Sequence, residues 1–159
     1  MNIALWGSES WALKEENRAK LETFHHGCLR RICGWTMWDI AERRLTNEDT
    51  RRTAGNSPTM ESMMEMRRCR WLSKLSAMEE SRSPRRMLGA WCSTKRAVGR
   101  PQQTIRHAYI TTLEKLGFEG EKGQLKEWMT VARDRAAWGQ RVESQLDLPP
   151  GSFTNLRRH

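Results

Sequence analysis

The sequence has few residues of the kinds that stabilise secreted or membrane proteins. Its cysteines stand at irregular positions, Cys28, Cys33, Cys69 and Cys92, in a chain of 159 residues, which is not the spacing of a disulfide framework. No window approaches the roughly 18 apolar residues that cross a bilayer, and the first residues lack the basic flank and apolar run of a secretory signal. We therefore expect an intracellular protein, nuclear or cytoplasmic, with no membrane partner.

The sequence also has little of what builds a sheet. No apolar–polar alternation of useful length follows Trp6, and such alternation indicates a half-buried strand. Hydrophobic residues make up only 37% of the chain and the mean hydropathy is −0.81. Eight Trp and nine Met are nevertheless too many for a disordered chain. We expect an all-α protein, either one domain or two small helical pieces.

Helical periodicity predicts about five helices in a loose bundle. They cover residues 15–33, 46–54, 57–78, 101–116 and 124–145, the last of them interrupted near Asp134. Thr46 with Asp49, and Ser57 with Pro58, are typical of helix starts, and Gly34 is placed as a residue that ends a helix. The chain then divides into a helical segment (1–56), a basic helix and loop (57–101), a C-terminal helical pair (102–146) and a frayed, disordered tail (147–159).

Apolar residues at three-four spacing define the expected buried faces. The first helix should bury Leu21, Phe24, His25, Cys28 and Ile32. The third should bury Met60, Met64, Trp71, Leu75 and Met78.

What the chain does have is positive charge, and that charge is concentrated. The net charge is +9, and residues 67–106 hold eleven Lys or Arg against two Glu, which already gives +9. The other residues hold 17 bases and 17 acids. A basic segment inside an otherwise neutral protein indicates a polyanionic partner. We expect that partner to be RNA or DNA, as a duplex or a hybrid.

The basic side chains expected to contact phosphates lie on the third helix and the loop after it. Arg67, Arg70 and Lys74 are spaced three and four apart and so share one helix edge. Trp71 could stack on a base, but its position in the apolar stripe favours the core. Gly99-Arg100-Pro101 is either a minor-groove hook or, as we favour, a turn that starts the next helix. The full set is Arg67, Arg68, Arg70, Lys74, Arg85, Arg86, Lys95, Arg96 and Arg100.

The Cys and His residues of the chain do not have the spacing of a metal site or of a catalytic nucleophile. Structural zinc needs Cys or His pairs two to four residues apart, twice, whereas Cys28 and Cys33 are five apart and no second pair exists. Cys28 with His25 could form a thiol–imidazole pair, but no third group orients it. We therefore expect no metal, no cofactor and no catalytic residue.

Five sets of segments, in order along the chain, resemble those of a known family. They are Gly7-Ser8-Glu9-Ser10-Trp11; Leu21-Glu22, Phe24, Cys28-Leu29-Arg30-Arg31-Ile32 and Gly34; Arg67-Arg68 with Arg70-Trp71-Leu72; Pro84-Arg85-Arg86 with Gly99-Arg100-Pro101; and Asp134-Arg135 with Trp138. Together they are similar to the region downstream of the palm in reverse transcriptases of non-LTR (LINE-type) retrotransposons. The chain departs from that pattern at Ser73-Lys74, at Ile105 and in its Met-rich residues 60–66.

The resemblance implies a thumb and linker that grip template and primer beside an upstream polymerase palm. Polymerisation needs paired Asp residues that hold two metal ions about 4 Å apart. The aspartates of this chain are Asp39, Asp49, Asp134 and Asp147, scattered along it. We therefore expect a nucleic-acid-binding fragment that is not an enzyme by itself. The alternative is a degenerate or repurposed helical module that binds another protein.

Overall fold

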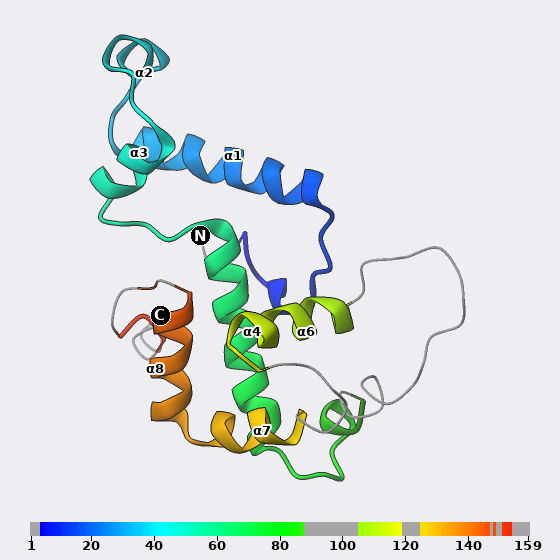
Figure 1. Ribbon diagram of the computed structural model, residues 1–159. Coiled ribbons are helices and arrows are strands. Elements are labelled where there is room, and N and C mark those ends of the chain that lie inside the picture. Colours follow the sequence, from blue (N-terminus) through cyan, green and yellow to red (C-terminus); the bar gives the residue numbers. More distant parts are fainter. Residues whose placement is uncertain (1–3, 88–104, 119–124, 147, 149–150, 154–159) are drawn as a thin grey trace. The chain divides into compact units, whose positions relative to one another are not determined.

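The computed structural model describes residues 4–87, 105–118, 125–146, 148 and 151–153. Over these residues the chain forms helices and turns and no strand (Figure 1), which confirms the all-α prediction. The helices are more numerous than the five predicted. They are η1 (Ser8–Ser10), α1 (Glu15–Ile32), α2 (Met37–Arg43), α3 (Asn47–Thr53), α4 (Met60–Ala77), α6 (Ile105–Lys115), α7 (Leu125–Arg133) and α8 (Arg135–Gln145), with a further helical stretch at residues 83–87.

The chain divides into two compact units. The α1–α3 unit is Leu13–Met63, and the α4–α8 unit combines Met1–Ala12 with Met64–His159. The N-terminal segment joins the second unit because Arg68 Nη2 donates to the Trp11 carbonyl at 3.1 Å. This contact spans 57 positions, and no local pattern in the sequence signals it.

The core of the α4–α8 unit gathers around two tryptophans. Trp128 and Trp138 are buried, with ring centroids 6.3 Å apart, and Trp138 Nε1 donates to the Cys69 carbonyl at 2.9 Å. Buried Trp residues bring large apolar area and a polar N–H that needs an acceptor. The apolar stripe predicted for α4 is confirmed in its main part, because Met60, Met64 and Leu75 are buried.

The end of the chain that the structure describes is not a frayed tail. Leu148 and Phe153 are buried in the same core. The Glu143 carboxylate accepts from the backbone N–H groups of Gly151 (3.0 Å) and Phe153 (2.7 Å). A β-carbon on Gly139 would lie 3.2 Å from Phe153 Cδ1, so the missing side chain there lets the ring settle against α8. The tail prediction is wrong for these residues because it considered only the breaking effect of Pro and Gly.

In the α1–α3 unit, α1 ends where it was expected to end. Gly34 has φ of 71°, and the N–H groups of Gly34 and Trp35 donate to Arg31 and Arg30 carbonyls at 3.1 and 2.9 Å. This is the hydrogen-bond pattern of a glycine C-cap.

The buried face of α1 agrees with the prediction at His25, which is buried, and differs from it at Phe24 and Ile32. His25, His26 and Leu29 are buried, whereas Phe24 and Ile32 are exposed. α1 packs against α3, and this contact selects a face rotated from the one that the apolar residues define.

The helix starts follow their capping residues, with one exception. Thr46 and Asp49 form the predicted capping box of α3, and Asp134 Oδ1 accepts from the N–H groups of Ala136 and Ala137 before α8. Ser57 does not cap α4, which begins at Met60 after a cap in which Thr59 Oγ1 accepts from Ser62 N–H at 3.1 Å.

Candidate nucleic-acid interface

Six of the nine predicted phosphate contacts lie among the described residues, and they differ in how deeply they are buried. Lys95, Arg96 and Arg100 lie outside the described residues. The other six lie on α4 and on the stretch that follows it, namely Arg67, Arg68, Arg70, Lys74, Arg85 and Arg86. Their surroundings divide them into buried, half-buried and exposed groups.

Arg68 is buried beside the N-terminal segment and beside Tyr109. Its guanidinium donates to the Trp11 carbonyl. Burial raises the pKa of the Tyr109 phenol, and the Glu9 carboxylate adds to this increase while the Arg68 charge opposes it. The phosphate contact of Arg68 stays a prediction, and in the structure this side chain is buried and holds Trp11 against α4.

Arg70 is half-buried and holds the C-terminal segment. Its Nη2 donates to the carbonyls of Ser152 (2.8 Å) and Phe153 (3.1 Å), and its guanidinium lies 5.6 Å from the centre of the Phe153 ring. Burial lowers the pKa of Arg70, and the neighbouring charges of Arg67 and Arg135 lower it further. Arg70 therefore acts mainly as a link inside the fold.

Arg85 is buried, with 8% of its surface exposed, and it caps the end of α4. Its Nη1 donates to the Ser76 carbonyl at 3.0 Å and to the Met78 carbonyl, and its Nη2 lies 3.3 Å from Glu80 Oε1. Arg133 Nε donates to the same Ser76 carbonyl at 3.1 Å. Arginines at a helix C-terminus satisfy its last carbonyls and its negative dipole end. The phosphate contact of Arg85 likewise stays a prediction, since the structure shows this side chain buried and bonded at the helix end.

Three exposed cations remain near the end of α4. Lys74 and Arg82 line an open depression of about 540 Å³ together with Ala77, Met78 and Glu79. Arg86 is exposed and lies one helical turn beyond Arg82, since its N–H donates to the Arg82 carbonyl at 3.0 Å. Arg82 was not among the nine predicted contacts, although it lies in the basic segment. We call Lys74, Arg82 and Arg86 the α4-end cations.

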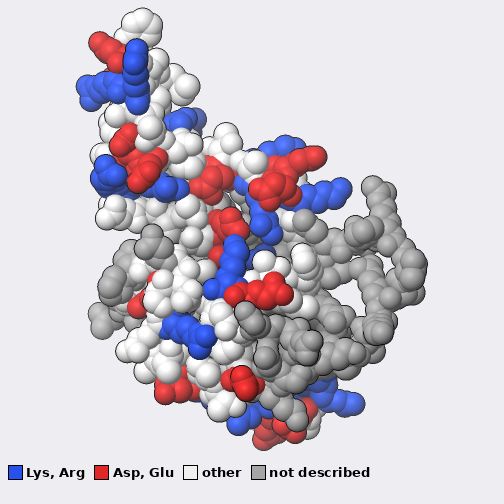
Figure 2. Space-filling model, in the orientation of Figure 1, with Lys and Arg blue, Asp and Glu red and all other residues white. Residues whose placement is uncertain are grey.

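The described cations have acids among them. On the face that Figure 2 shows, blue and red side chains are interspersed over the described surface. Glu79 lies in the depression beside Lys74 and Arg82. The concentration of charge along the sequence is therefore only partly a concentration in space.

Trp71 and Arg67 lie between these groups. Trp71 is partly buried against the core of the α4–α8 unit, which agrees with the favoured core interpretation. Arg67 is half-buried on α4 and already has a polar interaction within the chain.

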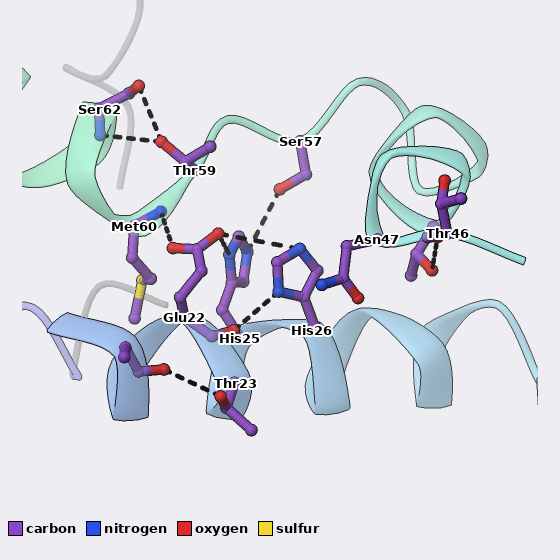
Figure 3. A network of polar contacts seen from close by, with 12 residues as sticks. Glu22, Thr23, His25, His26, Thr46, Asn47, Ser57, Thr59, Met60 and Ser62 are labelled. Atoms are coloured by element: carbon purple, nitrogen blue, oxygen red, sulfur yellow. Dashed lines mark hydrogen bonds and ion pairs between the residues drawn. The ribbon is translucent and has the colours of Figure 1, made fainter. Parts of the chain in front are cut away.

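A second set of ionisable groups lies inside the α1–α3 unit (Figure 3). Glu22 Oε2 accepts from the Met60 N–H at 2.9 Å, at the start of α4. Glu22 Oε1 lies 4.0 Å from His25 Nδ1 and 3.8 Å from His26 Nε2. Ser57 Oγ lies 3.4 Å from His25 Nε2. Burial lowers the pKa of His25, partly offset by the Glu22 carboxylate and reinforced by His26 and Arg51.

This network is structural in its geometry. His26 Nδ1 bonds the Glu22 carbonyl at 2.9 Å, and both imidazoles are buried, so no substrate reaches them. Cys33 Sγ is directed to the Thr50 carbonyl at 3.9 Å. Burial raises the pKa of the Cys69 thiol, which keeps it protonated. Within the described ranges, no three His, Cys, Asp or Glu side chains gather so as to hold a metal ion.

α2 was not among the predicted helices, and it carries exposed apolar and basic side chains. α2 has a Thr36–Asp39 capping box, the same Thr-x-x-Asp signature that predicted α3. Met37 and Trp38 on this helix are exposed, and so are Arg43 and Arg44 at its end. The capping signature was available in the sequence, but the short periodic stretch after it was not recognised.

Among the described helices, none is long and apolar enough to span a bilayer. Comparison of the chain with protein-family models, curated proteins and solved structures finds no match.

Proposed function

We propose that this chain binds the phosphate backbone of RNA or DNA, as part of the thumb and linker of a LINE-type reverse transcriptase that grips template and primer. It has no catalytic role of its own, and an upstream polymerase palm would supply the chemistry. The observation that supports this best is the exposure of Lys74, Arg82 and Arg86 around one helix end, in a chain of net charge +9.

Local charge compensation strengthens this proposal. Of the two acids in the basic segment, the exposed Glu80 lies 3.3 Å from the buried Arg85, so its charge is balanced by a cation other than the α4-end cations. Glu79 remains as the acid beside the α4-end cations. Contacts from Lys and Arg side chains to phosphate oxygens carry no sequence information directly. We therefore expect binding that depends on charge and duplex shape rather than on sequence.

Salt dependence of binding tests the proposal. The affinity for an RNA–DNA hybrid is measured by filter binding between 50 and 200 mM salt. Each phosphate contact contributes about −0.9 to the log–log slope, so three contacts alone would lower the affinity about 40-fold over this range. The triple variant Lys74→Gln, Arg82→Gln, Arg86→Gln should flatten the slope by about 2.7.

The matched control removes three exposed cations elsewhere. Lys14→Gln, Lys20→Gln, Arg52→Gln changes the net charge equally but lies in the α1–α3 unit, and it should leave the slope within about 0.5 of the original. Equal slopes for the two triple variants would show that the α4-end cations are not the binding site. Absence of hybrid retention at 100 mM salt would remove the proposed function altogether.

A further inference from the structure

α2 is the helix of the α1–α3 unit that the rest of the described chain covers least, with Asp39 and Ile40 half-buried and its other residues exposed. None of its residues is buried. Ile32, Met37 and Trp38 are 75%, 71% and 77% exposed, and they lie within seven positions of one another at the junction of α1 and α2. Figure 1 shows α2 standing apart from α1 and α3 at one end of their unit. An exposed cluster of large apolar side chains indicates a binding surface.

The charge around this cluster is positive. Arg31, Arg43 and Arg44 are exposed, and the acids of the same segment are Asp39 and Glu42. Asp39 is held in the capping box, where its carboxylate accepts from the Thr36 N–H at 2.8 Å and the Thr36 hydroxyl at 2.5 Å. Residues 30–44 thus hold four arginines, Arg30, Arg31, Arg43 and Arg44, against two acids, and Glu42 is the acid that the capping box does not use.

The backbone places one of these arginines at a strained position. Arg44 ends α2 with φ of 50° and ψ of 41°, a left-handed conformation in which Gly or Asn is the usual residue. Strain at a residue whose side chain is exposed is a feature of binding sites. The left-handed backbone at Arg44 is therefore consistent with a binding role for its exposed guanidinium.

We infer that α2 binds unpaired nucleotides, with Trp38 stacked on a base and Arg31, Arg43 and Arg44 on the adjoining phosphates. Aromatic platforms flanked by cations are how proteins hold single strands without sequence preference. This inference rests on the proposed nucleic-acid binding and adds a second, single-strand site to it.

The charge argues for this occupant over two others. Two copies of α2 brought face to face would oppose three guanidinium groups to three others, which disfavours a symmetric contact. A helix of seven residues is also much shorter than the helices that lie in a membrane interface. A polyanion with exposed aromatic bases matches both the apolar and the basic side chains of this segment.

A labelled 12-nucleotide oligouridylate is the probe, with the RNA–DNA hybrid as the second ligand. Trp38→Ala should weaken oligouridylate binding about tenfold and change hybrid binding less than twofold. Trp38→Phe should retain oligouridylate affinity within about threefold, because a benzene ring still stacks. Trp6→Ala is the matched control, since Trp6 is 82% exposed and lies in the α4–α8 unit, and it should change neither affinity.

The outcomes separate this inference from the proposed function. If Trp38→Ala weakens oligouridylate binding no more than Trp6→Ala does, the α2 site is wrong even when the α4-end variants weaken hybrid binding. If Trp38→Ala instead turns a sedimenting dimer into a monomer at unchanged affinity, α2 is a protein interface and the inference is also wrong. A third result is that Trp38→Ala loses oligouridylate binding while the α4-end variants leave hybrid binding unchanged. This result would support the α2 site and overturn the α4-end site. The far-ultraviolet circular dichroism of each variant confirms that the fold is retained.

Discussion

At the scale of single residues, the buried arginines show how cationic side chains can be structural. Arg85 satisfies two carbonyls at the end of α4 and balances Glu80. A methionine of similar length would keep the packing but leave those carbonyls without a charged donor. Hydrogen bonds to charged groups contribute more to stability than neutral ones.

We predict that Arg85→Met lowers the free energy of unfolding by about 2–3 kcal/mol. Urea denaturation followed by circular dichroism measures the change. Arg86→Met is the control, because Arg86 is exposed on the same helical stretch, and it should cost less than about 0.5 kcal/mol. Equal costs for the two variants would contradict the assignment of Arg85 as a helix cap.

His25 makes stability depend on pH. Burial lowers its pKa in the folded chain, so below about pH 6.5 the unfolded chain binds a proton that the folded chain does not. The free energy of unfolding should then fall with decreasing pH, by at most about 1.4 kcal/mol per pH unit, and His25 should have no effect above that range. Urea denaturation at pH 7.5 and pH 5.0 measures this difference.

The variant His25→Gln should flatten that pH dependence. His107→Gln serves as its control, because His107 is exposed on α6. A pH dependence that persists unchanged in His25→Gln would assign the effect to another group of the network.

At the scale of secondary-structure elements, α2 and α3 begin with the same capping box but differ in what supports them. α3 buries Thr50 and packs against α1, whereas α2 buries no residue. A seven-residue helix without tertiary packing is only marginally stable, so its cap carries a large share of its stability.

We predict that Thr36→Ala frays α2 without unfolding the rest. Amide hydrogen exchange of residues 37–43 should accelerate about fivefold, while the amides of α4 and α8 keep their protection. Thr53→Ala, an exposed Thr at the end of α3, should leave exchange in α2 unchanged. The hydrogen bonds from the Thr36 hydroxyl and N–H lower the pKa of Asp39 in the folded chain. The stability that this cap contributes is therefore complete above the ordinary carboxyl pKa, and it is lost as the pH falls through the lowered pKa of Asp39.

The segment after α8 is an element held by its contacts rather than by regular structure. Phe153 packs into the core, and its backbone is bonded to Arg70 and Glu143. We predict that Phe153→Ala lowers the free energy of unfolding by about 3–4 kcal/mol and exposes this segment to limited proteolysis. Phe24→Ala, at an exposed position of α1, should cost less than about 1 kcal/mol. A Phe153 variant as stable as the Phe24 variant would mean that residues 151–153 are not part of the core.

At the scale of the whole molecule, some of the described cations form hydrogen bonds inside the fold and others are exposed to solvent. Arg68, Arg70 and Arg85 attach the N-terminal segment, the C-terminal segment and the end of α4. Lys74, Arg82 and Arg86 stay exposed, and they are the described cations to which the proposed polyanion binding is assigned. The exposed arginines around α2 add a second basic region in a unit that is nearly neutral by sequence.

Helix content, the capping box at Thr46, the interruption near Asp134 and the glycine end of α1 could all be predicted, because they depend on residues within a few positions of one another. The functions of the arginines could not. The carbonyls that accept from Arg85, Arg68 and Arg70 lie 9, 57 and 82 positions away in the sequence. The sequence around an Arg or Lys does not show whether its partner is a phosphate or a buried carbonyl. The burial of Phe153 could not be predicted either, because the Pro and Gly residues before it indicate a disordered tail. Nor could the face of α1 that packs against α3. Burial depends on which segments come together, and that is decided only when the chain folds.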